Sequence, residues 1–309
     1  MQSERGDTLQ GMVILIGLFA LFFLVILPNN PVGPNGGTRS SSSSFVTNTQ
    51  RDTNLEKNSS YSKSVSLGSG NARYEIQSYK EYVTIRNRSR EEVNITGWKL
   101  RNAKDRRTFE LGGNLQRYPA DEARIPQASL FISPSGYSQM QNVILKPGEE
   151  AVITTGSIGA RNPYPITSFK ENICSGYLGA SENYSFTPPL SRSCPRPIDE
   201  PGVESLPNEC REFIRRMRTC RTPEFDTRNR DGEICSGCVD GQLLPSSCVA
   251  FIKEHYSYQG CIANHQSDPN FSKNTWRIFL NRGWEMWAKD YETIQLFDHS
   301  GKLVDYLSI

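Results

Sequence analysis

The sequence predicts a mainly β protein: a β-sandwich interrupted by a small helical, cysteine-rich insertion and preceded by an N-terminal transmembrane helix. Three observations support this fold class. An uncharged apolar stretch lies near the amino terminus, short apolar segments alternate with turn residues along the chain, and all eight cysteines lie between Cys174 and Cys261. The 24 glycines and 18 prolines, with only 36% hydrophobic residues, favour a turn-rich β protein over a helical bundle.

The apolar stretch covers residues 11–27, which read GMVILIGLFALFFLVIL and carry no charge. A membrane span needs about 20 apolar residues, with a lower limit near 17. A cleaved signal peptide has a shorter apolar region and a small-residue cleavage site, and no such site follows Leu27. No cysteine follows for a lipoprotein anchor, and a polar run argues against a buried core helix. We therefore predict that residues 1–28 form an uncleaved signal anchor.

Residues 29–68 are predicted to be a disordered linker. They include the run NNPVGPNGG and five serines from Ser40 to Ser44, and such a composition buries too little apolar surface to become ordered. As a flexible coil, a chain of this length spans roughly 35 Å root-mean-square. The linker is expected to hold a folded body clear of the membrane.

The orientation of the anchor follows from the cysteines. Only Arg5 is basic before the span, so the positive-inside rule is uninformative here. A local, even-numbered cysteine cluster indicates disulfides, which persist in an oxidising compartment. We therefore expect a single-pass protein of the cell membrane with its carboxyl-terminal body outside the cytoplasm. A net charge of +2 does not favour nucleic acid as a partner.

The body begins with short strand-like segments separated by turns. They lie at residues 82–85, 93–100, 109–111, 143–145 and 151–153. Lys146-Pro147-Gly148-Glu149 is a turn, because proline fixes φ and glycine permits a positive φ. Short strands with turns about every ten residues indicate a sandwich or a barrel. Trp98 and Val304 are expected in its core, on alternating strand faces.

Three segments of this body resemble the lamin tail domain family. They are EYVTIRNRSREEVNITGWKLRN at residues 81–102, LKPGEEAVITTG at residues 145–156 and DYETIQLFDHSGKLVDYLSI at residues 290–309. The first resembles the family's opening pattern E-x-V-x-I-x-N followed by G-W-x-L, and the last its closing pattern I-x-L-x-D-x-x-G-x-x-V-D. The resemblance implies an immunoglobulin-like β-sandwich, which in bacteria is commonly an accessory module on exported proteins.

The chain departs from the family pattern between the second and third segments. About 110 residues intervene, where a plain member has a few tens at most. We therefore predict the first part of the sandwich at residues 69–165, a cysteine-rich insertion at residues 166–272 and the closing strands at residues 273–309. Insertions are tolerated at exposed loop tips, and a loop at one end of the sandwich is the expected place. The alternative is a separate small unit that begins near Trp276.

Two segments of the insertion share the pattern C-x-x-F-I-[RK]. They lie at residues 210–215 and 248–253, and each follows a proline and small polar residues that can start a helix. The pattern predicts two short helices packed together, with Cys210, Cys220, Cys248 and Cys261 as candidate cross-links. Chance similarity over six residues is the competing interpretation.

All eight cysteines are predicted to form disulfides, although the sequence does not determine their pairing. They are Cys174, Cys194, Cys210, Cys220, Cys235, Cys238, Cys248 and Cys261. Cys174 with Cys194, which flank an aromatic and proline-rich loop, is the first candidate pair. Such bridges typically contribute about 2–4 kcal/mol each, which a small insertion without a large core needs.

Metal and redox chemistry are the alternatives for the cysteines. Cys235 and Cys238 have zinc-ligand spacing, and Cys261 with His265 would complete a Cys₃His site. That set leaves five cysteines unexplained, so we expect no metal. A redox-active Cys235–Cys238 dithiol usually lies at a helix start in a βαβ unit, which the sequence does not predict here.

The sequence favours a protein that is not an enzyme and needs no cofactor. It contains no G-x-S-x-G, no H-E-x-x-H and no phosphate-binding loop, and neither His255 nor His299 has a catalytic setting. The three tryptophans Trp276, Trp284 and Trp287 favour core packing over an aromatic surface for carbohydrate or peptide.

The expected function is that of a non-catalytic, membrane-anchored surface protein. Its sandwich would be a scaffold that presents the disulfide-linked insertion to a protein or glycan ligand, in binding or adhesion. A structural envelope protein that self-associates is the first alternative, and a thiol- or metal-dependent enzyme centred on the insertion is the second. Because sandwiches host many functions, the fold alone does not choose among these.

Overall fold

The computed structural model describes residues 56–103, 108–111, 113–117, 121–158, 163–228, 232–287 and 292–309. The chain divides into two units, Met1–Asp52 and Thr53–Ile309, and all described residues lie in the second. The predicted membrane anchor at residues 11–27 lies outside the described residues. Among the residues that are described, no helix is long and apolar enough to cross a membrane.

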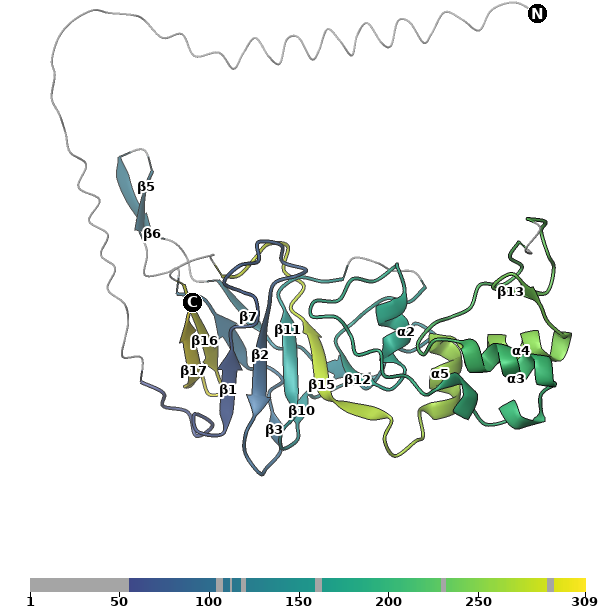
Figure 1. Ribbon diagram of the computed structural model, residues 1–309. Helices are drawn as coiled ribbons and strands as arrows, with labels where there is room; N and C mark the ends of the chain where they lie inside the picture. The colour runs from purple at the N-terminus through teal and green to yellow at the C-terminus, as the bar shows by residue number, and fades with distance from the viewer. Residues whose placement is uncertain are drawn as a thin grey trace, which may run out of the picture. The chain divides into compact units, whose positions relative to one another are not determined.

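Two main sheets form the body (Figure 1). The larger has the strand order β1-β2-β11-β15-β12-β8-β9 and the smaller the order β17-β16-β4-β7. The strands of the larger sheet are β1 (Val65–Gly68), β2 (Tyr82–Asn87), β11 (Glu150–Thr154), β15 (Ser272–Phe279), β12 (Phe169–Asn172), β8 (Ala128–Ser129) and β9 (Met140–Gln141). Those of the smaller sheet are β17 (Leu303–Ser308), β16 (Thr293–Phe297), β4 (Lys99–Arg101) and β7 (Glu122–Arg124).

The described residues also form three pairs of short strands. They are β3 (Val93–Asn94) with β10 (Ile144–Leu145), β5 (Thr108–Leu111) with β6 (Asn114–Arg117), and β13 (Cys238–Val239) with β14 (Gln242–Leu243). The predicted strand segments at residues 82–85, 109–111, 143–145 and 151–153 and the predicted turn before β11 are confirmed, with Gly148 at φ +81° in that turn. The predicted segment at residues 93–100 is divided by a turn at Thr96 and Gly97 into β3 and β4, which belong to different sheets.

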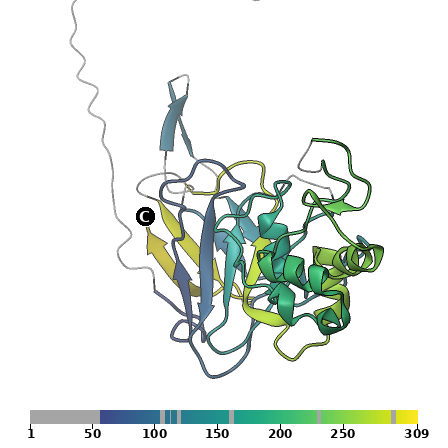
Figure 2. The same ribbon diagram turned by 45° about the vertical axis from the view of Figure 1, so that its right-hand side comes forward.

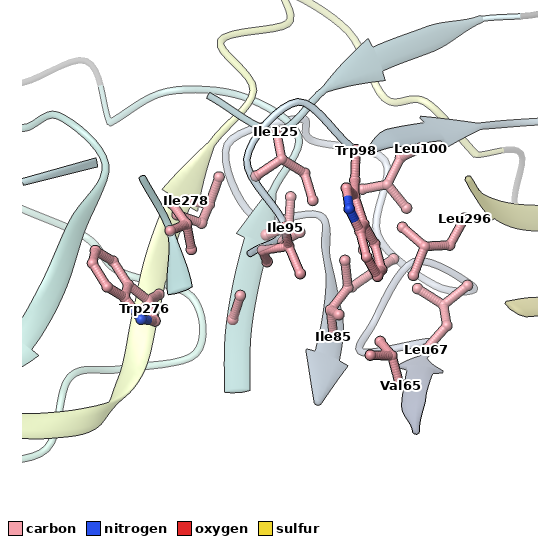
Figure 3. Close-up of a cluster of buried hydrophobic side chains, with 14 of the residues drawn as sticks. Val65, Leu67, Ile85, Ile95, Trp98, Leu100, Ile125, Trp276, Ile278 and Leu296 are labelled. Carbon is pink, nitrogen blue, oxygen red and sulfur yellow. The ribbon is translucent and has the colours of Figure 1, made fainter. Parts of the chain in front are cut away.

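The core between the two sheets is built from side chains at alternating strand positions. Val83 and Ile85 of β2 are fully buried, whereas Arg86 between Ile85 and Asn87 is exposed. Figure 3 shows Trp98 near Leu100 and Leu296, which come from neighbouring strands of the smaller sheet. Removing this apolar surface from water is the main driving force for joining the sheets.

The predicted linker ends earlier than residue 68. β1 pairs antiparallel with β2, and Val65 and Leu67 are buried in the core. The N–H of Leu67 donates a hydrogen bond to Asp305 Oδ2, 2.8 Å away in β17. The boundary was misplaced because a four-residue alternation of apolar and polar residues is hard to distinguish inside a polar stretch. β1 also contacts β17, whose Asp305 is 238 residues from Leu67 in the sequence.

The insertion begins after β12 rather than at residue 166. β12 pairs antiparallel with β15, and β15 runs parallel to β11, so β15 lies between two strands that precede it in the chain. Residues 173–271 therefore leave and re-enter the same sheet on neighbouring strands. Trp276 lies within β15 and is 2% exposed, so the alternative of a separate unit that starts there is wrong.

Most of the regular secondary structure in the insertion is helical (Figure 2). Its helices are α2 (Ser175–Ala180), η2 (Pro197–Asp199), η3 (Val203–Ser205), α3 (Asn208–Arg216), α4 (Ser246–His255) and α5 (Tyr258–His265). Pro207 and Pro245 precede α3 and α4 directly, which confirms the two predicted helices and their starts. α5 was not predicted; the Ser257 hydroxyl caps it by accepting a hydrogen bond from the N–H of Gly260.

Candidate functional site: the cross-linked insertion

All eight cysteines form disulfides, in the pairs Cys174–Cys261, Cys194–Cys220, Cys210–Cys248 and Cys235–Cys238. The predicted participation of every cysteine is confirmed. The predicted pair Cys174–Cys194 is wrong, because Cys174 precedes α2 and this helix packs against α5, which carries Cys261. Cys174 and Cys194, at the two ends of this loop, are therefore bonded to Cys261 and Cys220 and not to each other.

Cys210 and Cys248 join the two predicted helices at equivalent positions of the repeated pattern. The other two candidate cross-links, Cys220 and Cys261, bind partners outside this helix pair. Ile214 of α3 is fully buried in a small core that the two helices share, together with Val203, Val239, Leu244, Ile252 and Tyr256. The outer half of the insertion thus has its own apolar core under one disulfide.

The inner half of the insertion packs on the larger sheet. Its apolar cluster includes Phe169 of β12, Leu178 of α2 and Ile262 of α5. A second connection is polar: Arg277 of β15 pairs with Glu171 in the same sheet and donates to the backbone carbonyl of Pro188 at 2.7 Å. Because both charged side chains of that pair are about 6% exposed, the attachment is largely shielded from water.

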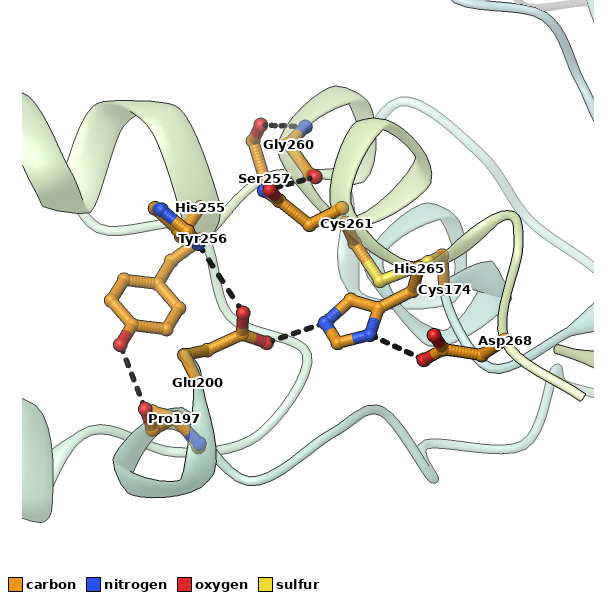
Figure 4. Close-up of polar contacts among 11 residues, drawn as sticks. Cys174, Pro197, Glu200, His255, Tyr256, Ser257, Gly260, Cys261, His265 and Asp268 are labelled. Atoms are coloured by element: carbon orange, nitrogen blue, oxygen red, sulfur yellow. Dashed lines mark hydrogen bonds and ion pairs between the residues drawn. A yellow bond between two sulfur atoms is a disulfide. The ribbon is translucent and has the colours of Figure 1, made fainter. Parts of the chain in front are cut away.

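A buried carboxylate, Glu200, lies between two histidines from different helices (Figure 4). Its oxygens are 2.8 Å from Nε2 of His265, at the end of α5, and 3.3 Å from Nδ1 of His255, at the end of α4. Asp268 lies on the other side of His265, 2.8 Å from Nδ1. A ring with carboxylates at both nitrogens donates from both, which requires the charged imidazolium.

The charge on His265 is favoured by its surroundings. Burial by itself would lower the pKa of His265, but the hydrogen bonds and charges of Asp268 and Glu200 outweigh burial and raise this pKa above 6.5. Neither ring nitrogen is then available as a general base. The cluster acts as a clamp that joins the loop after η2 to the carboxyl ends of α4 and α5.

Sequence reasoning missed this clamp. The sequence suggests His265 only as a possible zinc ligand and gives His255 no catalytic setting. Glu200 is 55 residues from His255 and 65 from His265 in the chain, so spacing carries no indication of the contact. The packing of α5 against α2 and α4 and the Cys174–Cys261 disulfide place the end of α5 beside Glu200 only in the folded protein.

The four residues of the alternative zinc site do not come together. Cys235 and Cys238 bind each other in the segment that leads into the β13–β14 hairpin, and Cys261 is bonded to Cys174 at the base of the insertion. Both ring nitrogens of His265 form hydrogen bonds with carboxylates, those of Asp268 and Glu200. Within the described ranges, no group of three or more histidine, cysteine or acidic side chains is arranged to hold a metal ion.

The three tryptophans do not share one environment. Trp276 and Trp287 are buried in the core, as the sequence favoured, whereas Trp284 is 61% exposed and its indole N–H donates to Asp121 at 3.1 Å. A continuous aromatic surface made of all three is therefore not formed.

In a comparison with protein families, residues 57–181 match the Lamin Tail Domain. This range starts just before β1 and ends directly after α2, so it covers the first part of the sandwich and the start of the insertion. The matched range begins at residue 57, which agrees with a linker that ends before β1. No curated protein and no solved structure matches this chain.

Proposed function

We propose that this chain, which residues 57–181 assign to the lamin tail domain family, is a non-catalytic, membrane-anchored surface protein. Its sandwich would present the insertion for binding. The scaffold is the pair of sheets. The binding element is the outer part of the insertion, which includes α3, α4 and the β13–β14 hairpin.

The observation that carries this proposal is the firm attachment of the insertion. It leaves and re-enters the sheet on the neighbouring strands β12 and β15, and the Cys174–Cys261 disulfide closes its base. Arg277 adds a buried polar connection between sheet and insertion. A surface held in one orientation loses little conformational entropy when it binds, which favours a binding role.

Two further features support the proposed location. Four disulfides are typical of a protein that matures in an oxidising compartment. The uncharged residues 11–27 are long enough for a signal anchor, and the polar residues after them would separate the body from the bilayer. The location and the membrane attachment are therefore part of the proposal.

The location is tested on the full chain in the cells that produce it. We expect the protein in the membrane fraction after alkaline extraction, and its body open to added protease in intact cells. Intact mass should rise by about eight units on reduction, because each disulfide gains two hydrogens. Free thiols in a protease-protected, extractable protein would contradict the proposal.

The binding role is tested by the assembly state of the purified full chain. A scaffold that presents a binding surface should keep one assembly state across concentration and change its sedimentation only when a ligand is added. Concentration-dependent oligomers without ligand would favour the self-associating structural protein instead. Turnover of a thiol or ester substrate that is lost in a Cys235→Ser/Cys238→Ser variant would favour an enzyme.

A further inference from the structure

The four disulfides differ in how well solvent reaches their cysteines. All eight cysteines lie among the described residues, and Cys235 is the only one of them that is not buried. In the other three disulfides each cysteine is 8% exposed or less. A thiolate has to reach one sulfur of a disulfide before it can exchange with it. An external thiol can therefore approach the Cys235–Cys238 disulfide more easily than the others, through Cys235.

The same disulfide closes the smallest loop. It spans 3 residues, whereas the other three span 26, 38 and 87. The restriction of the unfolded chain grows with the logarithm of the loop, so this disulfide adds the least to folding. Because folding and disulfide formation belong to one thermodynamic cycle, the fold in turn stabilises this disulfide the least. Little folding free energy therefore opposes its reduction.

Residues 232–237, called the arm below, lead into this disulfide. None of the six is buried, and Ile234 is 78% exposed. Contacts at the surface hold the arm, between the Cys235 N–H and the Thr227 carbonyl (3.2 Å), the Gly237 N–H and Asp226 Oδ1 (2.9 Å), Arg228 Nη1 and the Gly232 carbonyl (2.6 Å), and the backbones of Ile234 and Arg228. A segment with exposed hydrogen bonds and no buried apolar side chain has low local stability. The disulfide is thus the strongest attachment of the arm.

The other side of the disulfide is attached independently of it. Val239, which follows Cys238, is fully buried in the small core that α3 and α4 share. The N–H of Asp226 donates to the carbonyl of Cys238 at 2.8 Å. Arg221 forms two hydrogen bonds with the carboxylate of Asp240, at 2.7 and 3.0 Å. Loss of the disulfide should therefore free the arm and leave β13 in place.

We propose that Cys235–Cys238 is a thiol–disulfide exchange site for an external dithiol, and that its reduction releases the arm while the rest of the insertion stays folded. Catalytic cysteine pairs usually lie at a helix start, which stabilises the attacking thiolate. Cys235 and Cys238 lie in a turn before β13 instead, so the pair receives electrons and does not catalyse exchange between other molecules. The inference goes beyond the proposed binding role and does not depend on it.

The exchange begins at Cys235. A thiolate of the dithiol attacks Cys235 Sγ, the bond to Cys238 Sγ breaks, and Cys238 leaves as a thiolate that takes up a proton. The second thiol of the dithiol then attacks the dithiol's own sulfur in the mixed disulfide and releases Cys235, which also takes up a proton. Two electrons and two protons pass to the protein, and the dithiol becomes a disulfide. An external disulfide reverses these steps.

Selective reduction is tested on the full chain under native conditions. The protein is exposed to graded dithiothreitol, free thiols are blocked with iodoacetamide, and the modified cysteines are located by mass spectrometry. We expect Cys235 and Cys238 to be alkylated together at concentrations about tenfold below those that open any other pair. Cys194–Cys220 is the internal control, because it closes the next smallest loop and Cys194 is 8% exposed.

Release of the arm is tested by hydrogen exchange of the selectively reduced protein. The amides of Ile234 and Cys235 should exchange several-fold faster than in the oxidised protein, whereas those of α3 and α4 should not change. Cys235→Ser/Cys238→Ser should show the fast exchange with and without dithiothreitol. The matched control is Ser236→Ala, which alters an exposed residue of the same turn, keeps both cysteines and should behave as the unaltered chain.

Opening of another pair first, or of all four at one concentration, would overturn the exchange site. Selective reduction with unchanged exchange of Ile234 and Cys235 would show that surface contacts hold the arm, and would overturn its release. Faster exchange throughout α3 and α4 would overturn it as well, since the rest of the insertion would then unfold with the arm. None of these results bears on the binding role, which the assembly state and the response to ligand test separately.

Discussion

At the scale of single residues, buried titratable groups make the stability of this protein depend on pH. Glu81 is fully buried just before β2, and it accepts hydrogen bonds from the backbone N–H groups of Met286 (2.9 Å) and Trp287 (3.3 Å). Burial disfavours the carboxylate and raises the pKa of Glu81 from 4.5 to about 7, although those hydrogen bonds oppose the shift. The same side chain therefore connects β2 to the loop before β16 and titrates near neutral pH.

The pH dependence that Glu81 contributes has a definite sign. Because its pKa is higher in the folded protein, its contribution to stability is fully present below pH 4.5 and is lost as the pH rises through about 7. Glu81→Gln should remove on the order of 2 kcal/mol of the decline in unfolding free energy between pH 5 and 8.5. Urea titrations of both proteins across that range measure it. An equal decline in both would contradict the assignment to Glu81.

His265 gives a second dependence of the same sign. Its pKa is raised above 6.5 by Glu200 and Asp268 in spite of burial, so its contribution is fully present below pH 6.5 and is lost as the pH rises through the raised value. His265→Gln should therefore destabilise the protein more at pH 6 than at pH 8.5. Nuclear magnetic resonance of the His265 ring protons should give a titration midpoint above 6.5. A midpoint at or below that value would rule out the clamp as described.

At the scale of elements, the Cys194–Cys220 disulfide packs closely against α2 at Gly176. A Cβ atom placed on Gly176 would lie 2.2 Å from Cys220 Sγ and 2.8 Å from Cys194 Sγ. Neither sulfur can move freely, because each is bonded to the other. Gly176 is therefore required by the close approach of helix and disulfide, and not by the helical backbone.

Gly176→Ala should destabilise the protein by about 1–3 kcal/mol, the usual cost of overpacking a closed site. Gly283→Ala is the control, since a Cβ there meets nothing within 4 Å. Denaturant unfolding of the two variants compares them. Equal, small effects would show that α2 and the Cys194–Cys220 disulfide can separate without cost.

At the scale of the whole molecule, the disulfides differ in how much of the chain they restrict. Cys174–Cys261 spans 87 residues and Cys235–Cys238 spans 3. In the chain-entropy account the stabilisation grows with the logarithm of the closed loop, so the first contributes about 4–5 kcal/mol and the second about 1–2 kcal/mol.

Replacing each pair by serines tests that difference. Cys174→Ser/Cys261→Ser should lower the unfolding free energy by several kcal/mol and release the base of the insertion, whereas Cys235→Ser/Cys238→Ser should have a small effect. Denaturant unfolding measures the loss of unfolding free energy, and hydrogen exchange in α2 and α5 measures whether the base of the insertion is released. If both variants lost the same stability, packing and not the Cys174–Cys261 disulfide would hold the insertion on the sheet.

Local patterns in the sequence by themselves determined the strands near residues 82–87 and 151–153, the turn at residues 146–149 and the two helices that carry Cys210 and Cys248. They also determined the closing pair β16–β17 and the burial of Val304. Each of these features depends on alternation, turn chemistry or helix starts within about ten residues. The cysteine cluster likewise indicated that every cysteine would be bonded.

Only the tertiary structure decided which cysteines pair, where β15 lies and how the clamp around Glu200 forms. The Cys174–Cys261 bond and the contact of Glu200 with His265 join positions 87 and 65 residues apart, and no local pattern encodes such distances. The sequence analysis did not identify β1 for the same reason, since β1 lies against β17, and the N–H of Leu67 donates to Asp305, 238 residues away. Contacts between distant segments depend on the packing of the whole body, which local patterns in a single sequence do not determine.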